Sequence, residues 1–326
     1  MPSASDSTRR VSRLRCLSGL AAFLVAALLN SGTGNVRAAE YPVVTVEEGI
    51  VYSKVGDKEL QLDLARPEGE GPFPALVFIH GGGWQGGNRA AYRGEIEYVA
   101  ARKGYVAITV GYRLTDPDDK MKARHPFPDQ IHDVKAAIRW LRANASQYKV
   151  DPDHFGAIGA SAGGHLSLLA GLTDAKSCLE GTGGHPEQSS RVQAVVNYFG
   201  PTDMTYYMNS EIYPKEGPVY GMVTRLLGGT DKEVPEQYRL ASPIAHVTPD
   251  DPPVLTLQGD MDPLVPHKHA ELLDEKMKAA GVPHDLVMFK GAGHGFPGES
   301  GKKAQRLTYE FFDKHLKTKP KSDAGK

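Results

Sequence analysis

The sequence predicts an α/β fold in which a mostly parallel, eight-stranded sheet carries helices on both faces. Short continuous apolar runs, which suit strands covered on both faces, alternate with longer segments of helical periodicity. Such alternation is typical of a parallel sheet, and several of the runs end in glycine-rich loops. The 326 residues suffice for one large domain or two small ones. We predict a single domain over residues 39–316.

Residues 1–38 have the pattern of a secretory signal peptide. Four arginines precede an apolar run over residues 17–29, which is too short for an ordinary membrane span. Val36-Arg37-Ala38 then provides the small-x-small pattern of a cleavage site. We therefore expect a secreted or periplasmic protein without stable membrane association after cleavage. The alternatives are an uncleaved anchor or a start placed too far upstream.

Charge and cysteine content limit the function classes further. Removing residues 1–38 takes away five arginines and one aspartate and shifts the formal net charge from −1 to −5. This balance gives no basic footprint for nucleic acid. One cysteine, Cys178, remains, so no intrachain disulfide can form. It falls in a polar segment, residues 173–191, without an adjacent histidine, and we expect it to have no functional role.

The domain is expected to begin with two antiparallel strands. Residues 59–65 alternate apolar and polar side chains, the period of a half-buried strand. Gly56-Asp57 provides a turn between this segment and an earlier strand at residues 49–55. Residues 73–79 are continuously apolar, as expected for the first strand buried on both faces.

Strands and helices then alternate to the end of the domain. Further strands are predicted at residues 105–110, 155–158, 192–199, 253–258 and 285–289. Helices are predicted at residues 90–103, 126–145, 165–170 and 266–280, and around Phe311 and Phe312. Residues 150–153 have the composition of a turn, and the end of the chain, residues 317–326, that of a frayed tail.

Residues 201–252 interrupt this alternation. They contain several tyrosines and methionines together with proline and glycine. We predict a small lid inserted over the ends of the strands. Its aromatic side chains either line an acyl or aryl pocket or pack within the lid itself.

Four loops are expected to meet at one edge of the sheet. They are residues 80–84, 159–164, 259–266 and 291–296, and each follows a predicted strand. The carboxyl ends of parallel strands lie at the same edge, and ligands of such sheets bind there. The sequence therefore places its candidate site at this edge.

The loop at residues 159–164, with the sequence GASAGG, joins an apolar strand to an apolar helix. Gly-x-Ser-x-Gly at such a corner is the pattern of a nucleophile elbow, in which the serine adopts a strained conformation. We expect Ser161 to be the nucleophile. Gly159 and Gly163 are expected because a Cβ would clash where strand and helix pass closely.

A serine hydroxyl needs a base, and a histidine oriented by a carboxylate is the usual one. Of the 12 histidines, His294 alone lies in a glycine-flanked loop directly after a late strand. Asp260 and Asp262 both lie in the preceding loop. We prefer Asp262, with Asp260 expected to bind loop amides instead. The order Ser161, Asp262, His294 is the one that this reaction uses in sheets of this type.

The segment at residues 80–84, with the sequence HGGGW, follows a buried strand. Bare backbone N–H groups in such a loop suit the oxyanion of a tetrahedral intermediate. We expect Gly82, Gly83 and the residue after the serine, Ala162, to donate these hydrogen bonds. The alternative for the triple glycine is a flexible surface turn. His80 is expected to brace the loop.

These four loops together resemble those of the α/β-hydrolase superfamily. Within it, the chain is most similar to bacterial feruloyl and acetylxylan esterases, which are related to hormone-sensitive-lipase-like carboxylesterases. The resemblance covers about residues 46–316. It implies a triad of Ser161, Asp262 and His294 and an oxyanion hole at the glycines after His80. The short lid departs from the long helical cap of the lipase-like members, which argues against lipase activity.

The sequence thus predicts a secreted serine esterase that acts on short acyl or aryl esters, including those on plant or algal polysaccharide. An arylformamidase, a peptidase-like hydrolase and a hydrolase-fold binding protein without activity are the alternatives. The partner expected is a small-molecule or polysaccharide-linked ester. No cluster of metal ligands or cofactor motif is visible, and this chemistry needs neither metal nor cofactor.

Overall fold

The computed structural model describes residues 9–12, 43–117, 123–208, 213–215 and 217–317. The predicted signal peptide lies outside these residues except for Arg9–Ser12, and so does the predicted tail except for Lys317. In the part of the chain so described, no helix combines the length and the apolar character needed to cross a membrane.

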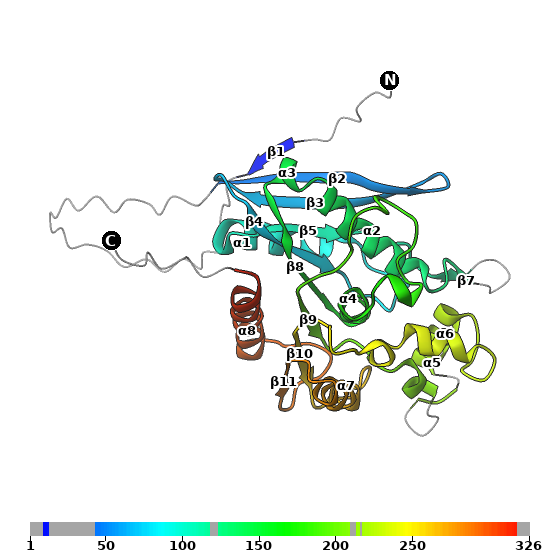
Figure 1. Ribbon diagram of the computed structural model, residues 1–326. Helices are drawn as coiled ribbons and strands as arrows, with labels where there is room; N and C mark the ends of the chain where they lie inside the picture. The colour runs from blue at the N-terminus through cyan, green and yellow to red at the C-terminus, as the bar shows by residue number, and fades with distance from the viewer. Residues whose placement is uncertain (1–8, 13–42, 118–122, 209–212, 216, 318–326) are drawn as a thin grey trace, which may run out of the picture.

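A twisted sheet runs through the centre of the molecule (Figure 1). Its strands follow the order β1-β2-β3-β5-β4-β8-β9-β10-β11. β2, β3 and β5 pair antiparallel, and from β5 to β11 every pair is parallel. The strands are β1 (Arg9–Ser12), β2 (Val44–Val55), β3 (Lys58–Pro67), β4 (Phe73–Ile79), β5 (Val106–Val110), β8 (Val150–Ala160), β9 (Ala194–Tyr198), β10 (Val254–Gly259) and β11 (His284–Phe289).

The predicted fold class is confirmed, with the short β1 added antiparallel to β2 beside the eight expected strands. Outside the sheet, β6 (Asp116–Pro117) and β7 (Ala123–Arg124) form a separate two-stranded ribbon. The main helices are α1 (Arg93–Lys103), α2 (Asp129–Ala143), α3 (Ala145–Tyr148), α4 (Ala162–Leu172), α5 (Pro218–Leu227), α6 (Pro235–Ala241), α7 (Lys268–Ala279) and α8 (Glu299–Leu316).

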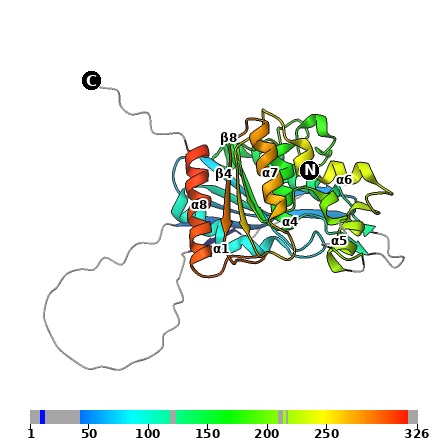
Figure 2. The same cartoon turned by 90° about the horizontal axis from the view of Figure 1, so that it is seen from below.

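Helices cover the sheet on both faces, as Figure 2 shows with α8 and α1 on one side and α4 and α7 on the other. The continuously apolar sequence of β4 is explained by its position in the sheet. Leu76 and Phe78 belong to the core shared with α1 and α8, whereas Val77 and Ile79 belong to the core shared with α2, α4 and α7. Both faces of the strand are therefore buried, so the alternation of a half-exposed strand is absent.

One expected boundary was wrong. Residues 150–153 do not form a turn but belong to β8, where Val150 pairs with Phe73 of β4. The register of this pair shifts between Phe73 and Ala75. Pairing with β4 thus extends the strand through Asp151-Pro152-Asp153, because an irregularity in the ladder accommodates residues that locally favour a turn.

Residues 201–252 contain α5, α6 and the 3-10 turns η3 (Met204–Met208) and η4 (Pro243–His246). Figure 1 shows α5 and α6 as neighbours to one side of the sheet, and α5 contacts both α6 and η3. Helix α5 is also fixed to the loop before α2, because the Phe127 amide donates to the Leu226 carbonyl at 2.9 Å. This placement brings α5 over the loop that follows β4.

Candidate active site

Ser161 lies at the sharp corner between β8 and α4. Its backbone has φ 57° and ψ −122°, a conformation that costs a non-glycine residue on the order of 1–3 kcal/mol. Two backbone hydrogen bonds hold it there. The Ser161 amide donates to the Tyr198 carbonyl at 2.9 Å, and its carbonyl accepts from the His165 amide at 3.0 Å.

The glycines around the serine are required by close approach of backbones. A Cβ on Gly159 would lie 2.4 Å from the carbonyl carbon of Gly163, and one on Gly163 only 2.0 Å from the Ile79 oxygen. Real Cβ atoms do not approach backbone atoms so closely, so no side chain fits at either position. β8 and α4 therefore pack closely, as the sequence analysis expected, and Ile79 of β4 approaches both glycines as well.

His294 and Asp262 meet at the edge formed by the loops after β11 and β10. The Nδ1 atom of His294 lies 2.7 Å from Oδ2 of Asp262. The Asp262 side chain is inaccessible to solvent, whereas the His294 side chain is 19% exposed. The other carboxylate oxygen accepts the amides of Leu264 and Val265 at 2.9 and 3.0 Å. The aspartate thus orients the imidazole through Nδ1, while Nε2 forms no hydrogen bond with any residue that the structure describes.

The environment of Asp262 keeps it ionised. Burial acts to raise the pKa of this carboxyl, but the hydrogen bonds from His294, Val265 and Leu264 outweigh burial, and the pKa lies below its usual value. Gln258, at the end of β10, contributes to the same arrangement, since its amide nitrogen donates to the Val265 carbonyl at 2.9 Å. Sequence reasoning missed Gln258, although a glutamine near the end of a mostly apolar strand was a visible signal.

Asp260, the alternative carboxylate, has a different partner. Its Oδ1 accepts the Gly291 amide at 2.6 Å, and its own amide donates to the Phe289 carbonyl at 3.2 Å. It therefore ties the loop after β10 to the loop after β11, in the way expected of the alternative aspartate.

The loop after β4 is packed against the rest of the molecule. The His80 ring stacks on Tyr112 with centroids 4.2 Å apart, and the Tyr112 hydroxyl donates to the His80 carbonyl at 2.9 Å. Gly82 has φ 116°, and its carbonyl accepts the Gly86 amide at 2.9 Å. Together these contacts brace the loop, as expected for His80, and a freely flexible surface turn does not describe it.

The N–H groups of Gly82, Gly83 and Ala162 donate no hydrogen bond to any described residue. Gly82 and Gly83 also line the same cavity as Ser161, whereas the buried Ala162 begins α4 directly behind the serine. Gly82 is exposed and Gly83 half-buried, so a substrate can reach these donors, and their grouping beside the serine suits the oxyanion of a tetrahedral intermediate.

Ser161 and His294 both line one cavity of about 450 Å³. Its wall is almost wholly apolar and comes from the loops after β4, β9, β10 and β11, the elbow and the lid. Besides the serine and the histidine, it includes Gly81, Gly82, Gly83, Trp84, Ala160, Phe199, Pro201, Tyr207, Pro218, Val219, Met222, Leu264 and Val265. Such a cavity suits a small apolar group more than a charged one.

The lid aromatics divide between the two roles expected of them. Tyr207 lines the cavity. Tyr206 instead packs on the His269 ring, with centroids 5.0 Å apart, and the Tyr213 hydroxyl donates to the Leu264 carbonyl at 3.2 Å. Some aromatic residues of the lid therefore line the pocket, and others pack or bond against the rest of the molecule.

Two further wall residues were not expected from the sequence. Phe199 has φ 40° and packs on the His294 ring with centroids 4.6 Å apart. Met222 of α5 lies against Gly83, where its sulfur would be 2.3 Å from an added Cβ. No local pattern pointed to either residue, because their roles depend on segments distant in the chain.

Comparison with known proteins agrees with this geometry. Residues 62–277 match the model of the family described as BD-FAE. Esterase LipC of Mycobacterium tuberculosis is 34% identical over 228 residues, which are 69% of this chain and 53% of LipC. The chain thus spans about half the length of these curated relatives, which include LipM and LipQ of the same organism.

Solved structures show the same likeness over most of the chain. A truncated carbohydrate esterase from gut microbiota is 30% identical with a TM-score of 0.72, covering 85% of this chain and 98% of the esterase. Esterase 2 of Thermogutta terrifontis with bound propionate is 30% identical with a TM-score of 0.67, covering 84% and 96%. Another structure of that esterase is phosphorylated by paraoxon.

Proposed function

Since the chain belongs to the BD-FAE family of α/β-hydrolases, we propose that it is a serine carboxylesterase that hydrolyses short acyl or aryl esters. One observation carries this proposal. A serine in the strained elbow conformation and a histidine bonded to a buried aspartate line one apolar cavity together with unpaired backbone donors. This is the set of groups that acyl transfer requires.

In the proposed reaction, the Oγ of Ser161 attacks the ester carbonyl carbon while Nε2 of His294 accepts its proton. Asp262 accepts a hydrogen bond from Nδ1–H throughout and stabilises the imidazolium that forms. The oxyanion of the tetrahedral intermediate accepts hydrogen bonds from Gly82, Gly83 and Ala162. Collapse of the intermediate expels the alcohol, which takes the proton from His294 and leaves an acyl-enzyme.

Water then completes the cycle. His294 removes a proton from the water molecule as its oxygen attacks the acyl carbon, and a second tetrahedral intermediate forms at the same donors. Its collapse breaks the bond to Oγ, and His294 returns the proton to Ser161. The products are a carboxylic acid and the regenerated serine.

The cavity supports the choice of substrate class. Its volume of about 450 Å³ and its apolar wall accommodate a short acyl or a single aryl group. Two relatives point the same way, since one is described as a carbohydrate esterase and another binds propionate. We therefore propose acetyl or feruloyl groups on plant or algal polysaccharide as the natural substrates.

Export is part of the same proposal. The arginines, the short apolar run and the cleavage pattern of residues 1–38 support secretion or transfer to the periplasm. A polymer substrate outside the cell is consistent with that location. The mass of the protein recovered from the culture medium or periplasm tests the proposed export and cleavage. A protein retained in the cytoplasm with residues 1–38 intact would contradict them.

Hydrolysis of 4-nitrophenyl acetate by residues 39–326 and by Ser161→Ala tests the activity. We expect turnover by the first and a loss of several orders of magnitude in the second. Acetylated xylan, methyl ferulate and N-formylkynurenine then separate polysaccharide esterase from arylformamidase activity. A protein that folds but turns over none of these substrates would contradict the proposal.

A further inference from the structure

His165 lies on α4, four residues after Ser161, and has no part in the proposed chemistry. Its side chain is completely buried. Fully buried histidines need partners for both ring nitrogens, because an unpaired polar atom inside a protein is costly. His165 has two partners, and they come from two different segments of the chain.

The first partner is Trp84, at the end of the glycine loop after β4. The Trp84 Nε1 lies 3.2 Å from His165 Nδ1, and the two rings meet edge to face with centroids 5.2 Å apart. An indole nitrogen only donates, so His165 Nδ1 must accept. The ring proton is therefore on Nε2.

The second partner is the lid. His165 Nε2 donates to the carbonyl of Ala241, the last residue of α6, at 2.7 Å. Burial lowers the pKa of His165 to about 4, which agrees with a neutral ring that accepts at one nitrogen and donates at the other. One side chain thus joins the glycine loop, the elbow helix and the lid.

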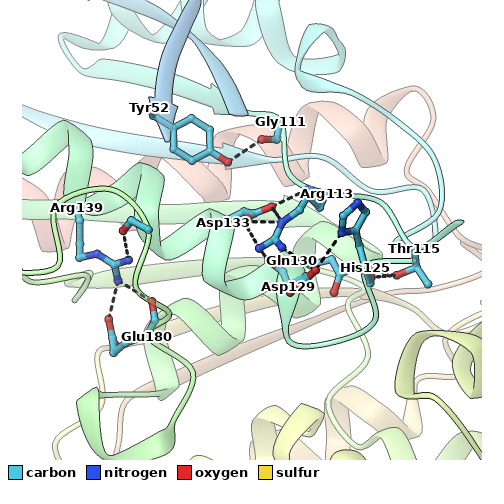
Figure 3. A network of polar contacts seen from close by, with 11 residues as sticks. Tyr52, Gly111, Arg113, Thr115, His125, Asp129, Gln130, Asp133, Arg139 and Glu180 are labelled. Atoms are coloured by element: carbon cyan, nitrogen blue, oxygen red, sulfur yellow. Dashed lines mark hydrogen bonds and ion pairs between the residues drawn. The ribbon is translucent and has the colours of Figure 1, made fainter. Parts of the chain in front are cut away.

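Trp84 needs such support, because it has φ 60°, a conformation that bulky side chains rarely adopt. Its carbonyl accepts the Thr115 amide at 2.8 Å. Thr115 is itself fixed, since its hydroxyl donates to the His125 carbonyl at 3.0 Å and accepts from Gln130 at 2.9 Å (Figure 3). The backbone end of Trp84 is therefore held by one network and its indole end by His165.

Figure 3 also shows ion pairs beside that network. Arg113 is nearly buried and binds Asp133 with two nitrogens, at 2.8 Å and 2.6 Å, and Asp129 at 2.7 Å. These ion pairs attach the segment before Thr115 to α2. Of the two supports of Trp84, the His165 contact is the one that also reaches the lid.

We propose that His165 is a positioning residue, which holds Trp84 and thereby keeps the N–H groups of Gly82 and Gly83 at the distance that the oxyanion requires. This inference rests on the proposed esterase function. Gly83 and Trp84 are consecutive, so a movement of the indole is transmitted directly to the donors. A shift of about 1 Å at such donors costs roughly 100-fold in rate, chiefly in kcat.

The chain contains only two tryptophans, which makes the contact measurable. In a Trp140→Phe background, Trp84 is the sole indole and its emission reports on its surroundings. His165→Leu in that background should shift the emission and lower kcat for 4-nitrophenyl acetate by about 10- to 100-fold, with KM changed less than threefold.

His246→Leu is the matched control. His246 also bonds a lid carbonyl, that of Leu240 at 2.8 Å, and among the described residues it forms no hydrogen bond with the glycine loop. The same substitution there should lower the melting temperature comparably while leaving kcat and Trp84 emission within twofold of the background protein. If His246→Leu lost kcat to the same extent, the loss in His165→Leu would be explained by lower stability alone, and the inference would be overturned.

His165→Gln and Trp84→Phe keep the test valid if His165→Leu does not fold. Glutamine retains one acceptor and one donor, so it should recover at least tenfold of a 100-fold loss. Trp84→Phe removes the indole donor and leaves a smaller aromatic ring, and its effect on kcat should not add to that of His165→Gln. Full activity of Trp84→Phe would overturn the inference.

Failure of the proposed function is distinguishable from failure of this inference. Absence of ester turnover by the unmodified protein contradicts the function, and the inference falls with it. Normal turnover that is unchanged by His165→Leu, with or without an emission shift, contradicts the inference alone.

Discussion

The Nδ1 atom of His294 lies 2.7 Å from Oδ2 of Asp262, although 32 residues separate the two in the chain. They meet because β10 and β11 are parallel neighbours, so the loops that follow them open at the same edge of the sheet. Asp260, two residues earlier, turns to the Gly291 amide instead. We therefore expect substitution of Asp262 to reduce catalysis strongly and substitution of Asp260 to affect it little.

Asp262→Asn should lower kcat for 4-nitrophenyl acetate by about 10³- to 10⁴-fold, because asparagine favours the wrong tautomer of His294 and cannot stabilise its charge. Asp260→Asn is the matched control and should retain kcat within about fivefold, with a loss of roughly 1 kcal/mol of unfolding free energy from its weakened loop contact. Steady-state kinetics and urea unfolding measure both. Equal losses of kcat in the two variants would contradict the assignment.

Gly163→Ala should disrupt folding rather than chemistry alone. The added methyl would lie 2.0 Å from the Ile79 carbonyl oxygen and 2.8 Å from that of His80. Both oxygens belong to the backbone, which cannot move aside as a flexible side chain could. We expect a loss of at least about 3 kcal/mol of unfolding free energy, measured by urea titration. Gly94→Ala in α1 is the control, since nothing lies within 4 Å of its added Cβ, and it should stabilise by about 0.5–1 kcal/mol.

Met222→Ala should broaden acyl selectivity. The Met222 side chain fills the cavity wall beside Gly83, so its removal makes room for about two more acyl methylenes, each worth about 0.8 kcal/mol when buried. The ratio of kcat/KM for 4-nitrophenyl hexanoate to that for the acetate should rise about tenfold. Met208→Ala, in the lid but outside the cavity wall, should leave the ratio unchanged. An unchanged ratio in Met222→Ala would contradict the proposal that Met222 limits the length of the acyl group.

Acid should destabilise the protein through two buried histidines. Burial lowers the pKa of His165 to about 4 and that of His269 to about 3. Between these values and about 6.5, the unfolded chain binds protons that the folded protein does not, so stability falls as the pH falls. By pH 5 each histidine should contribute a loss of about 2 kcal/mol, measured by urea unfolding from pH 7 to pH 4.5.

A variant separates this effect from general acid denaturation. His269→Gln should make the stability less dependent on pH between 7 and 5, because the amide does not titrate. An identical pH dependence in His269→Gln and the unmodified protein would contradict the prediction.

Much of the fold was predictable because it depends on local patterns. The continuous apolar run of β4 indicated burial on both faces, and GASAGG indicated a strand, a corner and a helix. The prediction of a turn at residues 150–153 was wrong because pairing with β4 overrode the local preference of Asp-Pro-Asp. Where tertiary hydrogen bonds compete with local tendency, sequence patterns lose their predictive value.

The sequence by itself determined the order of strands and helices and the loops that carry Ser161, Asp262 and His294, because periodicity and glycine placement act over a few residues. Only the tertiary structure decided which aspartate faces His294, and that His165 joins Trp84, 81 positions earlier, to the lid. Those contacts depend on how distant segments pack in three dimensions. A hydrogen bond of this kind forms only after the sheet and its helices have brought the partners within about 3 Å.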